Sequence, residues 1–380
     1  MRRIYSIATV LYLLMQVSQL AGQLSTQDHL SEPGFWPTQN AASRDNFKGP
    51  SACARCHRAK VASAQATPMG GTAMPAGTSQ ILHSHPQLSF AAKQFHYRID
   101  TDQTASRYSI SDGKRSLSFD LAWAFGIGRV GQSYLFKSAG ELYEARVTYF
   151  ETLKGLDFTP SREIGSPKGI EEAMYRRVGG AEVLRCFSCH TTASSIGSKF
   201  DEEHLIPGVT CEACHGPGAA HIATMSSPAT GLPDAGKVAI FNSAHLDPVD
   251  AVEFCGACHG AWWDVKLSAV KGASTARSAP YRLVTSKCWG KGDARLVCTE
   301  CHDPHGPLQT NSAEYDKTCL SCHVNGNGTR PTASHPGPAC QVATRNCTTC
   351  HMQKVYVREM HDTFTDHRIR IAKAGEPFPE

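Results

Sequence analysis

One five-residue motif, Cys-x-x-Cys-His, occurs seven times in this chain of 380 residues and constrains its folding more than any other feature. The cysteine pairs are Cys53/Cys56, Cys186/Cys189, Cys211/Cys214, Cys255/Cys258, Cys298/Cys301, Cys319/Cys322 and Cys347/Cys350, and the histidines that follow them are His57, His190, His215, His259, His302, His323 and His351. In a c-type haem site the two thiols bond to the porphyrin, and the adjacent histidine binds one axial face of the iron. The motif therefore predicts seven covalently attached haem c groups.

Zinc ribbons are the competing interpretation, since they also use Cys-x-x-Cys pairs. Zinc places no requirement on the residue after the second cysteine. With 18 histidines in 380 residues, seven chance occurrences have a probability on the order of 1 in 10⁹. Redox-active Cys-x-x-Cys motifs fail the same comparison, so haem attachment is the favoured interpretation.

The motifs are unevenly spaced. Six of them lie within Cys186–His351, and the first stands apart at Cys53. So many porphyrins in a short segment leave little room for a core made of protein alone, because haem faces must supply much of the buried apolar surface. We therefore expect a mainly α fold with a loop-rich multihaem core.

The interval between the first and second motifs has a different character. Runs such as SLSFDLAWAF (116–125) and ELYEARVTYFE (141–151) are rich in aromatic and aliphatic residues, several of which alternate with polar ones. Asp112-Gly113 and Ala139-Gly140 are turn signals. The pattern predicts a small antiparallel β meander inserted between haems 1 and 2, either to shield the first haems or to dock a partner.

These patterns divide the chain into four expected parts: a signal peptide at 1–22, an N-terminal segment with haem 1 at 23–89, a β-rich insert at 90–160 and a hexahaem cytochrome c domain at 161–370. At the N-terminus, two arginines precede the apolar run Ile4–Met15, and polar and small residues follow it up to Gly22. This is the order found in secretory signal peptides. The run is shorter than the roughly 20 residues that a membrane span needs, although an uncleaved anchor is the alternative. We expect an exported, periplasmic protein, which agrees with haem c assembly outside the bacterial cytoplasm.

The formal net charge of +4 is too small to indicate nucleic-acid binding. Ionised haem propionates would make the loaded protein acidic in any case. The expected partners are redox proteins, and membrane association would come only through a partner or an uncleaved N-terminus.

Histidines outside the motifs are candidate distal ligands. His221 follows the helix-breaking turn in CHGPGAAH. His305 lies in CHDPHG, where Pro304 directs it away from its own haem and towards a neighbour. His361 follows the last motif by ten residues. The other candidates are His335, His96, His204 and His245, with His83 and His85 as weaker ones and His367 interpreted as structural; Met69 and Met74 are alternatives for haem 1.

The number of distal ligands decides between two functions. If every iron has two ligands, the protein only transfers electrons. If one iron has an open face, the alternative is a multihaem oxidoreductase of a small nitrogen or sulfur compound. A structural subunit of a larger haem assembly is a third hypothesis.

Two cysteines, Cys288 and Cys340, belong to no motif. In an oxidising compartment the simplest prediction is one disulfide between them, and two separate thiols are the alternative.

The segments GVTCEACHGPGAAH, SKCWGKGDARLVCTECHDPHG and CTTCHMQK followed by HDTFTDHRI resemble exported multihaem cytochromes of the cytochrome c-554 family. The resemblance covers about residues 50–370. It implies mostly bis-histidine haems in stacked pairs, a role in electron transfer, and distal-ligand positions at His221, His305 and His361. The family often has a histidine after the first motif, where this chain reads Thr67-Pro68-Met69. The chain lacks both tetratricopeptide repeats and the Cys-x-x-Cys-Lys motif of pentahaem nitrite reductases.

Overall fold

A computed structural model describes residues 43–160, 167–197, 199–227, 240–268, 270–291, 296–323, 340–373 and 376–379. The predicted signal peptide and His335 lie outside these ranges. Within them, no helix combines the length and the apolar character needed to cross a membrane.

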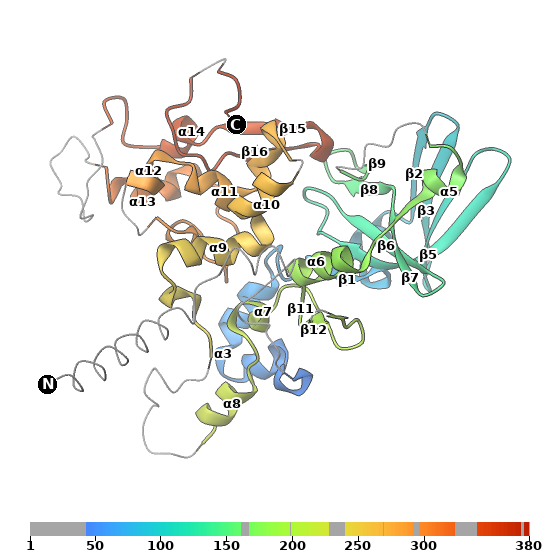
Figure 1. Cartoon of the computed structure of the whole chain (residues 1–380), viewed down its shortest axis with the longest axis horizontal. Coiled ribbons are helices and arrows are strands. Elements are labelled where there is room, and N and C mark those ends of the chain that lie inside the picture. Colours follow the sequence, from blue (N-terminus) through green and yellow to red (C-terminus); the bar gives the residue numbers. More distant parts are fainter. Residues whose placement is uncertain are drawn as a thin grey trace, which may run out of the picture.

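A large antiparallel sheet dominates one side of the molecule (Figure 1). It has eight strands in the order β10-β7-β6-β5-β4-β3-β2, with β1 paired to β5 outside this path. The strands are β1 (Ala73–Pro75), β2 (Gln87–Ala92), β3 (Phe95–Thr101), β4 (Ser106–Ser111), β5 (Ser116–Phe125), β6 (Ser133–Ser138), β7 (Glu141–Ala145) and β10 (Tyr175–Arg177). A separate hairpin pairs β8 (Val147–Phe150) with β9 (Gly155–Phe158).

The prediction of a mainly α fold is therefore wrong. An antiparallel meander does occupy the interval between the first two motifs, but it is not a small insert. It includes β1, which lies before residue 90, β2, which begins at Gln87, and β10, which lies after residue 160. The physical reason is that this interval holds enough apolar and aromatic residues to build a core without any cofactor.

That core lies between the sheet and the short helix α5 (Ile170–Met174). Strand β3 alternates buried and exposed side chains as a half-buried strand should. The hydroxyls of Tyr97 and Tyr108 donate to the α5 carbonyls of Ala173 and Met174 at 3.1 and 2.8 Å. These bonds satisfy both buried hydroxyls and fix α5 on the sheet.

Short helices carry most of the motifs and fill the other side of the molecule (Figure 1). In chain order, the elements that contain motif residues are α3 (Pro50–Gln65), α6 (Gly180–His190), α7 (Cys211–His215), α9 (Pro248–His259), η6 (Cys298–Glu300), α13 (Asp316–Leu320) and α14 (Cys347–His351). Between them lie α4 (Gln80–Ser84), α8 (Ala219–Met225), η4 (Ser243–His245), α10 (Trp262–Leu267), η5 (Gly272–Arg277), α11 (Ala279–Val284) and α12 (Lys287–Lys291). The hairpin of β15 (Lys354–Val357) and β16 (Asp362–Thr365) follows the last of them. Helix α6 joins the two sides, because Phe187 packs edge-on against Trp123 and Phe125 of β5.

Candidate haem-binding sites

In α6, α7, α9 and α14 the motif forms the last turn of the helix and the histidine is its final residue. Cysteines three residues apart lie on the same face of a helix, as one porphyrin requires. All sixteen cysteines are free thiols. Cys288 and Cys340 are among them, so the bridge between them stays a prediction.

Thiols of different motifs contact one another. Cys53 hydrogen-bonds to Cys211, and this bond is the main reason that the pKa of Cys211 falls to about 7. Cys189 hydrogen-bonds to Cys258, and Cys255 does so to Cys298. Between the sixth and seventh motifs, Cys319 hydrogen-bonds to Cys347.

Further electrostatic interactions link the third motif to the fourth, through Cys214 and Cys258, and the fifth to the sixth, through Cys301 and Cys319. Together these contacts arrange the motifs in the spatial order 1-3-4-5-6-7, with motif 2 beside motif 4. We call this arrangement the motif series.

The second cysteines of the last two motifs, Cys322 and Cys350, have different surroundings from the thiols that define the motif series. The sulfur of Cys322 lies 3.8 Å from the hydroxyl of its neighbour Ser321, and that of Cys350 lies 3.8 Å from the hydroxyl of Thr349. Cys322 is half-buried, whereas Cys350 is exposed. The structure thus places both predicted attachment thiols against their own chain neighbours, and their bonds to haem stay a prediction.

Three pairs of histidine rings have the spacing that haem ligation needs. The ring centroids are 6.4 Å apart for His57 and His221, 5.9 Å for His215 and His305, and 6.1 Å for His302 and His367. An iron between two imidazole nitrogens, with bonds of about 2 Å each, places the ring centres roughly 6 Å apart. The residues of these pairs therefore fit a haem iron between them.

Hydrogen bonds orient two of these rings and also the ring of His351 in the seventh motif. The Nδ1 atoms of His215, His351 and His367 donate to the backbone carbonyls of Phe241, Arg370 and Thr365 at 2.9, 3.1 and 3.0 Å. This leaves Nε2 for a metal, an arrangement common to histidine ligands.

Burial also keeps ring nitrogens neutral, the form that binds iron. It lowers the pKa of His367 to about 4 and lowers the pKa of His190 and of His259.

Comparisons with known proteins find multihaem cytochromes among the similar sequences and structures. A sequence profile of the family described as cytochrome c554 and c-prime matches residues 161–216. The multiheme cytochrome MtrA of Shewanella baltica (strain OS185) is 24% identical over 228 residues, which are 49% of this chain and 62% of MtrA. This alignment spans less than two thirds of MtrA. The chain is a multihaem c-type cytochrome.

Among solved structures, the outer cell wall cytochrome OcwA superposes with a TM-score of 0.46 at 13% identity, covering 86% of this chain and 80% of OcwA.

Two candidate distal ligands of the cytochrome, His221 and His305, lie beside motif histidines. His361 instead takes a left-handed backbone conformation (φ 49°). Its Nε2 lies 2.8 Å from Oδ2 of Asp157 in β9, and its ring packs edge-on against Phe150.

The remaining candidates make other contacts. His96 is exposed on β3. Nδ1 of His204 lies 3.0 Å from Asp201, and Nε2 of His245 lies 3.4 Å from the Asn242 amide. His83 Nε2 is 2.9 Å from the Gly77 carbonyl.

The place of His367 beside a motif histidine is one that sequence reasoning did not predict. The segment HDTFTDH holds two histidines, and the sequence favours the first as a ligand and the second as structural. The structure instead brings the second, His367, to His302. The local sequence does not tell which of the two histidines reaches His302, because that depends on the path of the chain after β16.

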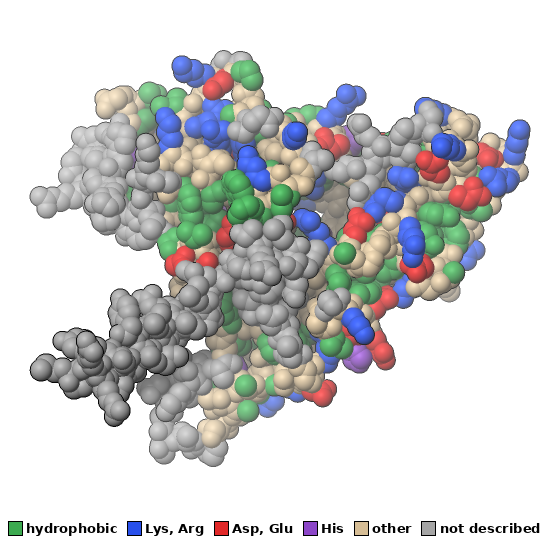
Figure 2. All heavy atoms as spheres, in the orientation of Figure 1, with side chains coloured by type: hydrophobic (Ala, Val, Ile, Leu, Met, Phe, Trp, Pro, Cys, Tyr) green, Lys and Arg blue, Asp and Glu red, His purple; other side chains and the backbone are tan. Residues whose placement is uncertain are grey.

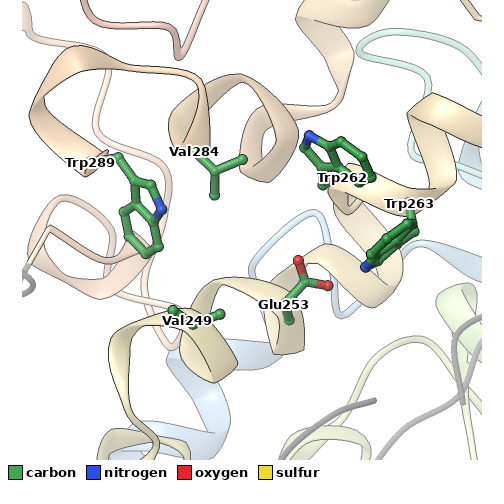
Figure 3. Close-up of a pocket in the computed structure, with 6 residues that line it drawn as sticks. All are labelled: Val249, Glu253, Trp262, Trp263, Val284 and Trp289. Atoms are coloured by element: carbon green, nitrogen blue, oxygen red, sulfur yellow. The ribbon is translucent and has the colours of Figure 1, made fainter. Parts of the chain in front are cut away.

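A cavity of about 320 Å³ lies beside α9, the helix whose last turn is the fourth motif (Figure 3). It is lined by Val249, Glu253, Trp262, Trp263, Val284 and Trp289. Val249 and Glu253 are four residues apart and share one face of α9, while Cys255 and Cys258 share another. Figure 2 shows hydrophobic side chains at the surface over α9, α10 and α11, and Trp262, which lines the cavity, is 36% exposed.

Proposed function

We propose that this cytochrome is an exported, periplasmic heptahaem protein that relays electrons between redox partner proteins. The observation that carries the proposal is the motif series, because every motif contacts at least one other. Haem c supplies a one-electron centre whose potential depends on its axial ligands and surroundings. Groups attached at contacting motifs would lie close enough together for rapid electron exchange.

The three histidine pairs support transfer rather than catalysis at their own motifs. If a haem iron were bound between the two rings of a pair, the histidines would leave no open face for a small molecule. They would also keep the same ligands when the charge of the iron changed. His57–His221, His215–His305 and His302–His367 come from segments far apart in the chain, so the folded protein itself sets their spacing.

The order of the motif series suggests where partners act. Motifs 1 and 7 are its ends, and we propose that electrons enter and leave near His57 and His351. Motif 2 is a side branch on motif 4, next to the sheet, where the ring of His190 packs edge-on against Phe125. The export that this proposal includes is supported by the order of residues 1–22.

Mass spectrometry and electron paramagnetic resonance of the loaded protein test the proposal. We expect the mass of seven haems and a low-spin ferric spectrum that nitrite, hydroxylamine and cyanide leave unchanged. A high-spin signal that responds to one of them would establish the oxidoreductase alternative instead. Fewer than seven haems would refute the heptahaem count.

A further inference from the structure

Glu212, the first variable residue of the third motif, is buried although it carries a carboxylate. Its exposed fraction is 1%. Burying a carboxylate is unfavourable unless hydrogen-bond donors surround it. Glu212 therefore needs a set of partners, and the identity of those partners indicates its role.

The first group of partners is the start of α3, which carries Cys53, Cys56 and His57. Oε2 accepts a hydrogen bond from the backbone N–H of Gly49 at 2.7 Å, and Oε1 accepts one from Lys48 at 2.8 Å. Gly49 is the N-cap of α3 and has a φ of 72°, and no side chain caps this helix from its own N-cap. The carboxylate of Glu212 supplies acceptors at this end, where the helix dipole also favours negative charge.

The second partner is the turn before α8. Oε1 also accepts a hydrogen bond from the N–H of Gly218 at 2.7 Å. His221 follows three residues later, in the first turn of α8. A Cβ at position 218 would come within 3.2 Å of Oε1, so glycine allows this close approach.

One carboxylate thus joins the segment that carries His57 to the segment that carries His221. We infer that Glu212 is a positioning residue for the first haem, whose two axial histidines it holds at their spacing of 6.4 Å. The inference rests on the proposed bis-histidine haem at this motif. It gives the third motif a second task besides attaching its own haem.

Asp316 provides a matched control at the other end of the motif series. Its side chain is also buried, and it accepts hydrogen bonds from the N–H groups of Asn346 and Cys347 at 2.6 and 2.8 Å. These donors belong to one segment only, the start of α14. Asp316 therefore fixes the seventh motif without joining two ligand segments.

Carbon monoxide binding to the reduced, haem-loaded protein tests the inference, since a haem with two histidine ligands resists it. In E212Q the amide keeps one acceptor oxygen and turns its NH₂ group towards a backbone N–H. In E212D the charge remains, but the shorter side chain cannot reach α3 and Gly218 together. We expect both variants to bind up to about one more molecule of carbon monoxide per chain than wild type, as H221A should. E171Q, at an exposed carboxylate in α5, should equal wild type.

The outcomes separate the inference from the proposed function. If wild type lacks a low-spin haem at Cys53/Cys56, the proposed function fails first. If wild type behaves as proposed and both Glu212 variants bind no extra carbon monoxide, the inference is wrong. It is also wrong if E212D matches wild type while E212Q does not, because charge rather than reach would then matter.

Peptide mass analysis covers variants that mature poorly. Haem loss confined to Cys53/Cys56 supports the inference, whereas loss confined to Cys211/Cys214 or spread over all motifs contradicts it. D316N should leave the first haem unchanged.

Discussion

The sheet and the motif-bearing helices are stabilised in different ways. In the described residues, both hydrophobic core clusters are built from the sheet and its close neighbours, with Tyr97, Tyr108 and Phe136 each at most 1% exposed. The region after α6 contains twelve of the sixteen cysteines and joins neither cluster except at Phe200 and Leu205. The sheet has an apolar core made of side chains, and we expect the motif region to depend more on its cofactors for buried apolar surface.

The two regions meet through both polar and apolar contacts. The indole N–H of Trp123 in β5 donates to Glu202 at 2.8 Å, and Lys137 in β6 pairs with the same carboxylate at 2.7 Å. The apolar face of α6 packs on β5, and its last turn carries the second motif. The second motif is therefore held against a core of side chains.

The largest effect should follow from withholding haem. In protein produced without haem attachment, we expect the amides of α9, α13 and α14 to lose their protection from hydrogen exchange. Strands β3–β6 should keep protection factors on the order of 10³ or more. Hydrogen exchange with mass spectrometry on both forms measures this. Equal protection of α9 in the two forms would contradict the comparison.

The next effect concerns a buried ion pair within the motif region. Arg282 and Asp366 are both 0% exposed and form two bonds, of 2.8 and 2.9 Å. D366N leaves the guanidinium without its charge partner and should lower the free energy of unfolding by about 3–5 kcal/mol. Denaturant unfolding of the haem-loaded protein measures the loss.

The matched control is D120N in the sheet, which breaks the exposed pair of Arg107 and Asp120 and should change the stability by less than about 1 kcal/mol. A change for D366N no larger than that of D120N would show that the buried pair does not stabilise the region.

A smaller effect tests the core of the sheet. Tyr108→Phe removes the hydroxyl that donates to Met174 and should lower the free energy of unfolding by about 1–2 kcal/mol. Tyr134 is equally buried, but its hydroxyl has no hydrogen-bond partner in the described structure. Tyr134→Phe should therefore be neutral or slightly stabilising. Equal losses in the two variants would mean that the bond to α5 contributes nothing.

The smallest effect is expected where the two regions touch. Asp157 of β9 and His361 form a partly exposed contact of 2.8 Å. Asp157→Asn should change the stability by less than about 1 kcal/mol and leave the low-spin haem spectrum as it is. A change in that spectrum would instead make His361 an iron ligand, as the family resemblance implied.

Local patterns in the sequence predict local features well. The seven motifs identify the candidate attachment residues, and period-two alternation identifies the strands of the meander. Strands β1 and β10 could not be predicted in this way, since each has three residues and exists only through pairing with β5 or β7. The pairing of His302 with His367 is equally non-local, because it depends on how the chain leaves β16. The same holds for the thiols, since nothing in the repeated motif distinguishes exposed Cys350 from the thiols that contact another motif.

The contacts of Glu212 also have a consequence for biosynthesis. The ribosome makes Gly49 and His57 more than 150 residues before Glu212 and His221. All the strands of the large sheet lie in the stretch between them. The first haem site can therefore be completed only after this stretch has been made, and a sheet that folds slowly would delay its maturation. A substitution in the sheet, far from any iron, could then lower the yield of fully loaded protein without altering the finished product.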